Sequence, residues 1–107
     1  MSKNVRVLTP EGKCTIERSQ ELKRELLDGL EESAQKLLVN LSHVTEIDTS
    51  FVLLLYAAKQ EASKQDKQLH LSGSVQESVR EALQLGGFCE HASESAPDLE
   101  DKLLDFR

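Results

Sequence analysis

The segment FVLLLYAA, residues 51–58, restricts the possible folds of this chain most, because it places eight uncharged residues in a row. Arranged as a helix, these residues are apolar on every side for two turns, so the helix must be buried or covered by another protein. Three polar residues, Asp48, Thr49 and Ser50, stand directly before it and form the helix mouth. One face of the predicted helix carries Phe51, Leu55, Ala58 and Ala62.

The segments on either side of this helix predict strands. KLLVNL, residues 36–41, is nearly continuous in apolar residues, as is typical of a central strand covered by helices. QLHLS, residues 68–72, alternates between polar and apolar residues and predicts another strand. The intervening SHVTEID, residues 42–48, is interpreted as a loop. The core side chains expected to face one another between sheet and helices are Leu38, Leu41, Leu55 and Val79.

The amino-terminal part of the chain predicts two strands and a helix. NVRVL at residues 4–8 and CTI at residues 14–16 flank the Pro/Gly turn TPEGK, and this arrangement predicts a β-hairpin. From Ser19 the period changes, because apolar residues recur every four positions while Glu and Lys fill the other face. The pattern indicates an amphipathic helix of about 15 residues. Its core side carries Leu22, Leu26, Leu30 and Ala34.

The carboxyl-terminal part predicts two further helices. Ser74 and Glu77 form an S-x-x-E capping box that opens a helix, and the Gly-Gly pair at 86–87 ends it. A short strand is expected at residues 88–91. PDLEDKLLDF, residues 97–106, has acids in its first turn and predicts a terminal helix. The apolar residues at helical spacing in it are Leu99, Leu103 and Phe106.

The order of these elements predicts the fold class. A chain of 107 residues is long enough for one compact core and hardly for two. Strands and helices alternate without a linker, a repeat or a low-complexity segment. We therefore expect a single domain over residues 1–107, of the α/β class, with helices over a small mixed sheet of four or five strands.

Charge and hydropathy limit the partners that the chain can have. The formal net charge is −6, from 13 basic and 19 acidic residues, and the basic residues are scattered. Nucleic acid and anionic membrane surfaces are therefore not expected partners. The uncharged run is well short of the roughly 20 residues that span a bilayer, so we expect no membrane insertion. The segment MSKNVRV lacks the apolar core of a secretory signal, and we expect a cytoplasmic protein.

No residue pattern in the sequence indicates an enzyme, a metal site or a cofactor. Ser50 is not part of a G-x-S-x-G elbow, and no glycine-rich phosphate-binding loop is present. The three histidines lie far from one another in the sequence, and the two cysteines also lie far apart and are expected to be reduced thiols. A phosphoaccepting Asp48 would require further acids at the end of the first strand, where NVRVLT supplies none.

The helix mouth allows two interpretations. A Ser or Thr at the start of a helix can accept a hydrogen bond from an unpaired backbone N–H, which typically contributes about 1 kcal/mol. On this interpretation the hydroxyls of Thr49 and Ser50 only cap a buried helix. Two hydroxyls in a row nevertheless exceed what one cap needs, so one of them is a candidate functional group.

Residues 39–88 resemble the STAS domain family, which includes the bacterial anti-sigma factor antagonists. They read VNLSHVTEIDTSFVLLLYAAKQEASKQDKQLHLSGSVQESVREALQLGGF, and IDTS is the tightest match to the family pattern. PDLEDKLLDF resembles the last helix of the family, so the resemblance covers essentially the whole chain. It implies a small mixed sheet of four to five strands with about four helices packed largely on one side.

The resemblance implies a non-catalytic regulatory module that binds a partner protein without a cofactor. Ser50 occupies the position that is phosphorylated in the phosphorylatable members of the family, and Thr49 is the substitute acceptor. The implied partner is an ATP-binding anti-sigma or switch kinase, which would phosphorylate Ser50 and so release the domain. The implied partner-binding residues are Glu46, Asp48, Thr49, Ser50 and Phe51.

A second function within the same family stays open. STAS proteins also include unphosphorylated adaptors, subunits that dock on the ATPase of a lipid-transporting ABC system with the same helix and loop. This chain departs from the family at Phe51, because Gly usually follows the serine. A bulky ring at that position can change how closely a kinase approaches, or it can add a contact to a partner.

Overall fold

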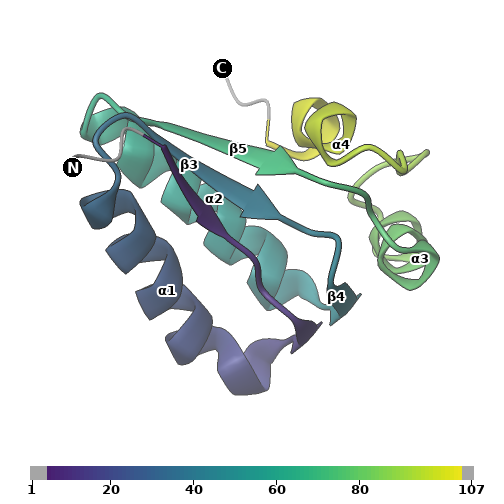
Figure 1. Cartoon of the computed structure of the whole chain (residues 1–107). Helices are drawn as coiled ribbons and strands as arrows, with labels where there is room; N and C mark the ends of the chain where they lie inside the picture. The colour runs from purple at the N-terminus through teal and green to yellow at the C-terminus, as the bar shows by residue number, and fades with distance from the viewer. Residues whose placement is uncertain (1–4, 105–107) are drawn as a thin grey trace.

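The computed structural model describes residues 5–104 and confirms the predicted α/β class. Three strands, β1 (Val5–Leu8), β3 (Lys36–Asn40) and β5 (Gln68–Ser72), form a parallel sheet in the order β1-β3-β5 (Figure 1). Each pair of neighbouring strands is joined by a crossover through a helix, as parallel strands require. The strands at 36–41 and 68–72 that the sequence predicts are therefore confirmed within one residue.

A second sheet contains only β2 (Gly12–Cys14) and β4 (Val44–Ile47), which also pair in parallel. The predicted hairpin is therefore wrong, because the first two strands belong to different sheets. Gly12 has a φ of +72° and donates its N–H to the carbonyl of His43 at 2.9 Å, which leads the chain toward β4. Turn residues indicate a bend, but they do not indicate which strand becomes the partner. Among the described residues, antiparallel pairing is limited to an isolated bridge between Ser74 and Ser95.

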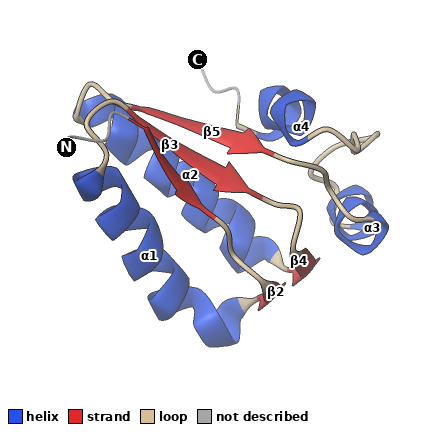
Figure 2. Cartoon of the chain, in the orientation of Figure 1, coloured by secondary structure: helices blue, strands red, loops and turns tan. Residues whose placement is uncertain are grey.

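Four helices surround the two sheets in the described part of the chain. Helices α1 (Ser19–Glu32) and α2 (Thr49–Lys64) lie side by side and cover one face of the larger sheet (Figure 2). Helix α3 (Glu77–Leu85) lies beside β4, and α4 (Ala96–Leu103) lies beside the edge strand β5. The three helices predicted from Ser19, after the helix mouth and near the carboxyl terminus are confirmed.

The larger sheet buries one face and leaves part of the other exposed. Leu37, Val39, Leu69 and Leu71 point toward the helices and are at most 1% exposed. The expectation that Leu38 faces the core is wrong, because Leu38 lies in register with Val7 on the opposite, partly exposed face. A nearly continuous apolar run does not reveal which alternate residues point inward, since a shift by one residue exchanges the two faces. The other expected core residues, Leu41, Leu55 and Val79, are buried.

Strand β4 replaces the loop expected at residues 42–48. Val44 and Ile47 at its two ends are buried, whereas Thr45 and Glu46 between them are exposed. This pattern lacks the alternation that identifies a half-buried strand in a sequence. The strand forms because β2, 32 or 33 residues earlier in the chain, supplies its backbone partners, and no local pattern records that pairing.

The start of α3 also differs from the prediction. The helix begins at Glu77 after Gln76, which makes no side-chain cap, so the S-x-x-E capping box is wrong. Ser74 instead donates its backbone N–H to the hydroxyl oxygen of Ser42, 3.1 Å away, and thereby joins the loop after β5 to the loop after β3. Ser74, which the local pattern assigned to a helix cap, thus makes a tertiary contact between the two loops instead.

The end of α3 agrees with the prediction, but the segment after it does not. The helix ends at Leu85 with Gly86 as its C-cap, and Gly87 has a φ of +78°, as is common after a helix. The short strand expected at residues 88–91 is absent, and those residues are bends and irregular backbone. Phe106 lies outside the described residues.

Candidate functional site

The helix mouth lies where β4 ends and α2 begins. Asp48 is the N-cap residue of α2, with an extended backbone, and its Oδ1 accepts the N–H of Ser50 at 3.0 Å. The cap is therefore a carboxylate, whereas the sequence interpretation assigned this role to a hydroxyl. A carboxylate at this place also lies at the positive end of the helix dipole, which is favourable.

The hydroxyl of Ser50 acts as a hydrogen-bond donor. It donates to Oδ1 of Asp48, the same atom that accepts the Ser50 N–H. The other oxygen, Oδ2, accepts the backbone N–H of Ile16 at 2.9 Å, which joins the short 3-10 helix Ile16–Arg18 before α1 to the start of α2. Asp48 thus holds both the candidate functional hydroxyl and a segment that lies 32 residues away in the sequence.

Asp48 is ionised at neutral pH. Desolvation by itself would raise its pKa, but hydrogen bonds from the Ser50 hydroxyl and the Ile16 N–H outweigh it and lower the pKa from its ordinary value. An ionised Asp48 keeps a full acceptor beside the Ser50 hydroxyl. The site therefore carries a negative charge before any modification, and Glu46 in β4 adds a second one nearby in the chain.

The predicted site residues differ in how far they reach the surface. Thr49 and Glu46 are exposed, and Asp48 and Ser50 are half-buried. Phe51 is only 2% exposed. The expectation that Phe51 contacts a partner is therefore corrected, because its ring has almost no surface to offer. Its side chain belongs to the core and packs on the interior side of the helix mouth.

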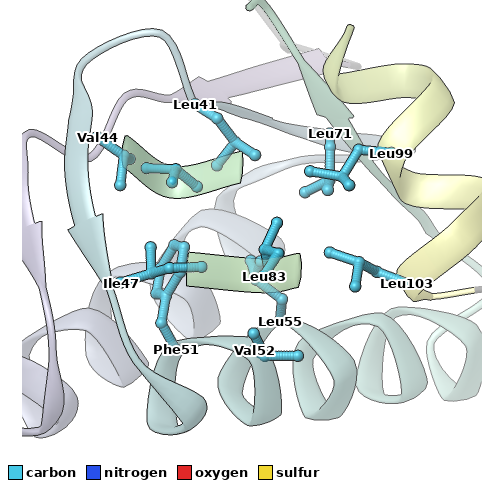
Figure 3. A pocket seen from close by; sticks show the side chains of 11 residues that line it. Leu41, Val44, Ile47, Phe51, Val52, Leu55, Leu71, Leu83, Leu99 and Leu103 are labelled. Atoms are coloured by element: carbon cyan, nitrogen blue, oxygen red, sulfur yellow. The ribbon is translucent and has the colours of Figure 1, made fainter. Parts of the chain in front are cut away.

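The core beneath the mouth is tightly packed. The ring of Phe51 lies beside Ile47 of β4, and Leu55 follows one turn later on α2 (Figure 3). The space left among these side chains is about 10 Å³, which is at the lower limit for a single water molecule. This apolar interior can therefore hold no ligand, and any binding at the mouth must take place on the outer surface.

Helix α3 holds β4 in place and so positions the mouth. The hydroxyl of Ser78 donates to the carbonyl of Thr45 at 2.7 Å, and the amide of Gln76 donates to the carbonyl of Ser42 at 3.0 Å. Both side chains satisfy backbone carbonyls in the segment that leads to the mouth. Sequence reasoning missed these two residues, because an ordinary polar residue on a helix surface carries no local signal of such a contact.

Two large apolar side chains near the mouth are exposed. Ile16, whose N–H is held by Asp48, is 64% exposed, and Leu53, three residues after Ser50 on α2, is 61% exposed. Sequence reasoning assigned Ile16 to a strand and did not single it out. Exposed apolar residues beside a polar site are typical of surfaces that bind other proteins.

A second cluster of charged residues joins α4 to the sheet. Glu100 is 6% exposed, and its Oε1 accepts the N–H of Leu71 at 2.6 Å on the open edge of β5. Its Oε2 lies 2.5 Å from Nζ of Lys59 and 2.8 Å from Nδ1 of His70. Burial alone would raise the pKa of Glu100, but these hydrogen bonds outweigh it and lower the pKa. The cluster fastens α4 to the domain.

Other kinds of site find little support in the described residues. No group of three His, Cys, Asp or Glu side chains in residues 5–104 could hold a metal ion. Cys14 and Cys89 are free, and burial raises the pKa of both thiols, so they are protonated at neutral pH. Over the same part of the chain, no helix combines the length and hydropathy needed to cross a membrane.

Comparisons with known proteins agree with this fold. The family model described as STAS domain matches residues 1–102. A proposed anti-sigma factor antagonist from Thermotoga maritima is 25% identical, with a TM-score of 0.64, and the match covers 78% of this chain and 72% of that one. A sulfate transporter family protein from Wolinella succinogenes is also 25% identical, with a TM-score of 0.61, over 94% of this chain and 82% of that chain.

A more distant structure shares only the fold. A protein designated Mglu is 14% identical, with a TM-score of 0.58, and the match covers 74% of this chain but 19% of that chain. No curated protein sequence matches this chain. The same fold thus makes up most of one of these chains and a minor part of another.

Proposed function

Because the chain belongs to the STAS domain family, we propose that it is a non-catalytic regulatory module that binds a partner protein through the helix mouth. In this proposal the partner is an ATP-binding anti-sigma or switch kinase in the bacterial cytoplasm, and phosphorylation of Ser50 releases the module. The similarity to a proposed anti-sigma factor antagonist supports the regulatory role. The observation that carries the switch is the half-buried Ser50 hydroxyl beside ionised Asp48, at the family's phosphoacceptor position.

The physical basis of the switch is a change of charge on a surface that a partner protein can otherwise bury. A phosphate on Ser50 would add roughly −1.5 to −2 charges beside Asp48 and Glu46. A partner surface that buries the neutral hydroxyl would then have to desolvate that charge, which costs several kcal/mol. The helix N-terminus tolerates the phosphate itself, so the domain stays folded while the partner leaves.

Phe51 does not obstruct this proposal. The family usually has Gly after the serine, and a ring on the surface could hinder a kinase. The ring of Phe51 is instead buried with Ile47 beneath the mouth (Figure 3), whereas the neighbouring Thr49 and Leu53 are exposed. The substitution changes the core beneath the site more than it changes the approach to the site.

The test compares Ser50→Asp with Ser63→Asp, which adds the same charge to the same helix away from the mouth. The intact protein is used to capture partners from its native host, and binding to the recovered partner is then measured. Ser50→Asp should weaken binding at least tenfold, or about 1.4 kcal/mol, whereas Ser63→Asp should stay within twofold. Equal effects of the two variants would contradict a switch at the mouth.

Phosphate must also be mapped to the residue in protein from the host. The proposal expects it on Ser50, and Ser50→Ala should bind the partner and resist the kinase. Phosphate on Thr49 would move the acceptor by one residue and keep the mouth as the site. Phosphate on neither hydroxyl under several growth conditions, together with normal binding by Ser50→Asp, would remove the switch from consideration.

The alternative function is an unphosphorylated adaptor that docks on the ATPase of a lipid-transporting ABC system. The observation that favours it is the likeness, over 94% of this chain, to a protein of a transporter family. The adaptor would use the same mouth, so the two functions differ in the captured partner and in phosphate. An ATPase subunit recovered with the intact protein, and no phosphate on Ser50, would support the adaptor.

A further inference from the structure

An apolar groove lies between α1 and α2 and is open to solvent. Its volume is about 220 Å³, below the roughly 300–1,000 Å³ of pockets that bind small molecules. A groove of this size suits a few inserted side chains of another protein better than a cofactor. The lining residues that matter here are Lys23 and Leu27 of α1 and Leu54, Ala57, Ala58 and Glu61 of α2.

The groove continues directly from the helix mouth. Ser50, Leu54, Ala57 and Glu61 are spaced by four, three and four residues, so they form one row along α2. Because helical side chains lean toward the N-terminus, Leu54 leans toward Ser50. A protein that covers the Ser50 hydroxyl can therefore extend along the same face of α2 into the groove.

Exposed apolar side chains concentrate on this side of the molecule. Six large apolar residues in the described part are strongly exposed, and three of them flank the mouth and the groove. Ile16 is 64% exposed, Leu53 is 61% exposed and Leu27 is 40% exposed. Together with the apolar lining of the groove, these side chains make this side of the molecule a candidate protein-binding surface.

The charges beside the groove have opposite signs. Lys23 is exposed on α1 and Glu61 is half-buried on α2, and neither forms an ion pair with any residue in 5–104. Glu61 accepts only a hydrogen bond from the amide of Gln65 at 3.0 Å. The two charges are therefore available to a partner, which would need an acid facing α1 and a base facing α2.

We propose that the α1–α2 groove receives an amphipathic helix of the protein that binds the mouth, an inference that rests on the proposed function. Helices α1 and α2 lie side by side (Figure 2), and a third helix can pack in the groove between them. The small side chains of Ala57 and Ala58 in the lining let its axis come close. Apolar residues spaced by three or four insert between Leu27 and Leu54. An acid on one flank of the helix faces Lys23, and a base on the other faces Glu61.

Photocross-linking in the native host tests which segment occupies the groove. The intact protein carries p-benzoylphenylalanine in place of Leu27, and the control carries it in place of Leu85, which is 89% exposed at the end of α3. The adduct from position 27 should map to one amphipathic segment with acids and bases on opposite flanks. A synthetic peptide of that segment should gain helical circular dichroism on binding. An adduct with a second copy of this chain, with an extended segment, or with nothing would overturn the proposal.

Two variants test the groove with the cross-linked partner. Ala57→Trp fills the groove, and Gln60→Trp places the same ring on the same helix outside it. Ala57→Trp should weaken binding at least tenfold, and Gln60→Trp less than twofold. Lys23→Glu changes an exposed side chain and should weaken binding at least threefold, with the loss shrinking at high salt. Unchanged binding by both Ala57→Trp and Lys23→Glu would exclude the groove, even if one of the variants folds poorly.

Ser50→Asp separates this inference from the function on which it rests. If Ser50→Asp abolishes binding and Ala57→Trp does not, the mouth is the site and the groove is empty. If Ala57→Trp abolishes binding and Ser50→Asp does not, the groove holds the partner and the switch fails. Loss of binding in both variants supports both proposals, and loss in neither contradicts both.

Discussion

The carboxylate of Asp48 and the backbone N–H of Ile16 are 2.9 Å apart, although 32 residues separate them in the sequence. Through this hydrogen bond the start of α2 holds the short 3-10 helix that precedes α1. The same carboxylate accepts the N–H and the hydroxyl of Ser50. A new negative charge on Ser50 would therefore repel the carboxylate of Asp48. A displaced carboxylate would release the N–H of Ile16, whose exposed side chain is part of the proposed partner surface.

The first prediction concerns which residue caps α2. Asp48→Ala removes the acceptor for the N–H groups of Ser50 and Ile16, so it should lower the free energy of unfolding by about 1–2 kcal/mol. Ser50→Ala removes only a hydroxyl donor that can be replaced by water at Asp48, so its cost should be about 0.5 kcal/mol or less. Urea unfolding of both variants checks the order, and equal losses would mean that the hydroxyl has a larger structural role.

The second prediction concerns pH. Because the pKa values of Asp48 and Glu100 are lower in the folded protein than in the unfolded chain, their stabilisation is complete above the unfolded pKa of about 4. It is lost as the pH falls through the folded values. The free energy of unfolding should therefore decrease as the pH is lowered below about 5.

Glu100→Gln isolates the part of this pH dependence that comes from α4. Removing the charge leaves Lys59 without its carboxylate partner, and at pH 7 the variant should lose about 3 kcal/mol. The difference between variant and native protein should shrink as the pH falls through the lowered pKa of Glu100. A difference that stays constant while the native protein loses stability in acid would show that the charge of Glu100 is not what stabilises α4.

The third prediction uses two neighbouring leucines on β3. Leu37 is fully buried against the helices, so Leu37→Ala should cost about 2–5 kcal/mol. Leu38 is on the partly exposed face, so Leu38→Ala should cost about 1 kcal/mol. Thermal or urea unfolding of the pair checks which side of the sheet is the core. Comparable losses would place a second core on the face that carries Val5 and Val7.

The fourth prediction compares two glycines that share a left-handed backbone. Gly12 has a φ of +72° with open space at its Cβ position, so Gly12→Ala should cost about 1–2 kcal/mol from backbone strain alone. Gly73 has a φ of +82°, and an added Cβ would lie 2.2 Å from Oδ1 of Asn40 and 2.4 Å from the hydroxyl oxygen of Ser42. Gly73→Ala should therefore lose clearly more stability in the same unfolding assay, because the two loops must separate.

The elements that the sequence predicts correctly are those whose burial follows from a local period. The segment 51–58 predicts a helix, and α2 is that helix, with Phe51 and Leu55 buried but Leu53 exposed. The alternation at residues 68–72 is β5. The partners of the first strands were not predictable in this way. Parallel pairing joins residues about 30 positions apart, and turn residues such as Gly12 only mark where the chain bends.

The candidate site could likewise be predicted from the sequence only where the signal is local. The motif IDTS and the apolar run behind it identify Asp48 and Ser50 from the sequence alone. The link from Asp48 to Ile16, and the support that Ser78 gives to Thr45, depend on elements that meet only in the folded chain. The sequence places Phe51 on one helix face with Leu55, and both side chains are buried in the core.

The two-stranded sheet of β2 and β4 has a consequence for the dynamics of the site. Two strands alone are marginally stable in water, so this ladder depends on α3 and on the hydrogen bond from Ile16 to Asp48. Amide hydrogens in β4 should therefore exchange with solvent through a local opening that costs less free energy than the opening of β3, which is paired on both sides. The mouth would thus belong to a unit that opens while the larger sheet stays folded. A protein that binds only the closed form would slow exchange in β4 without touching it.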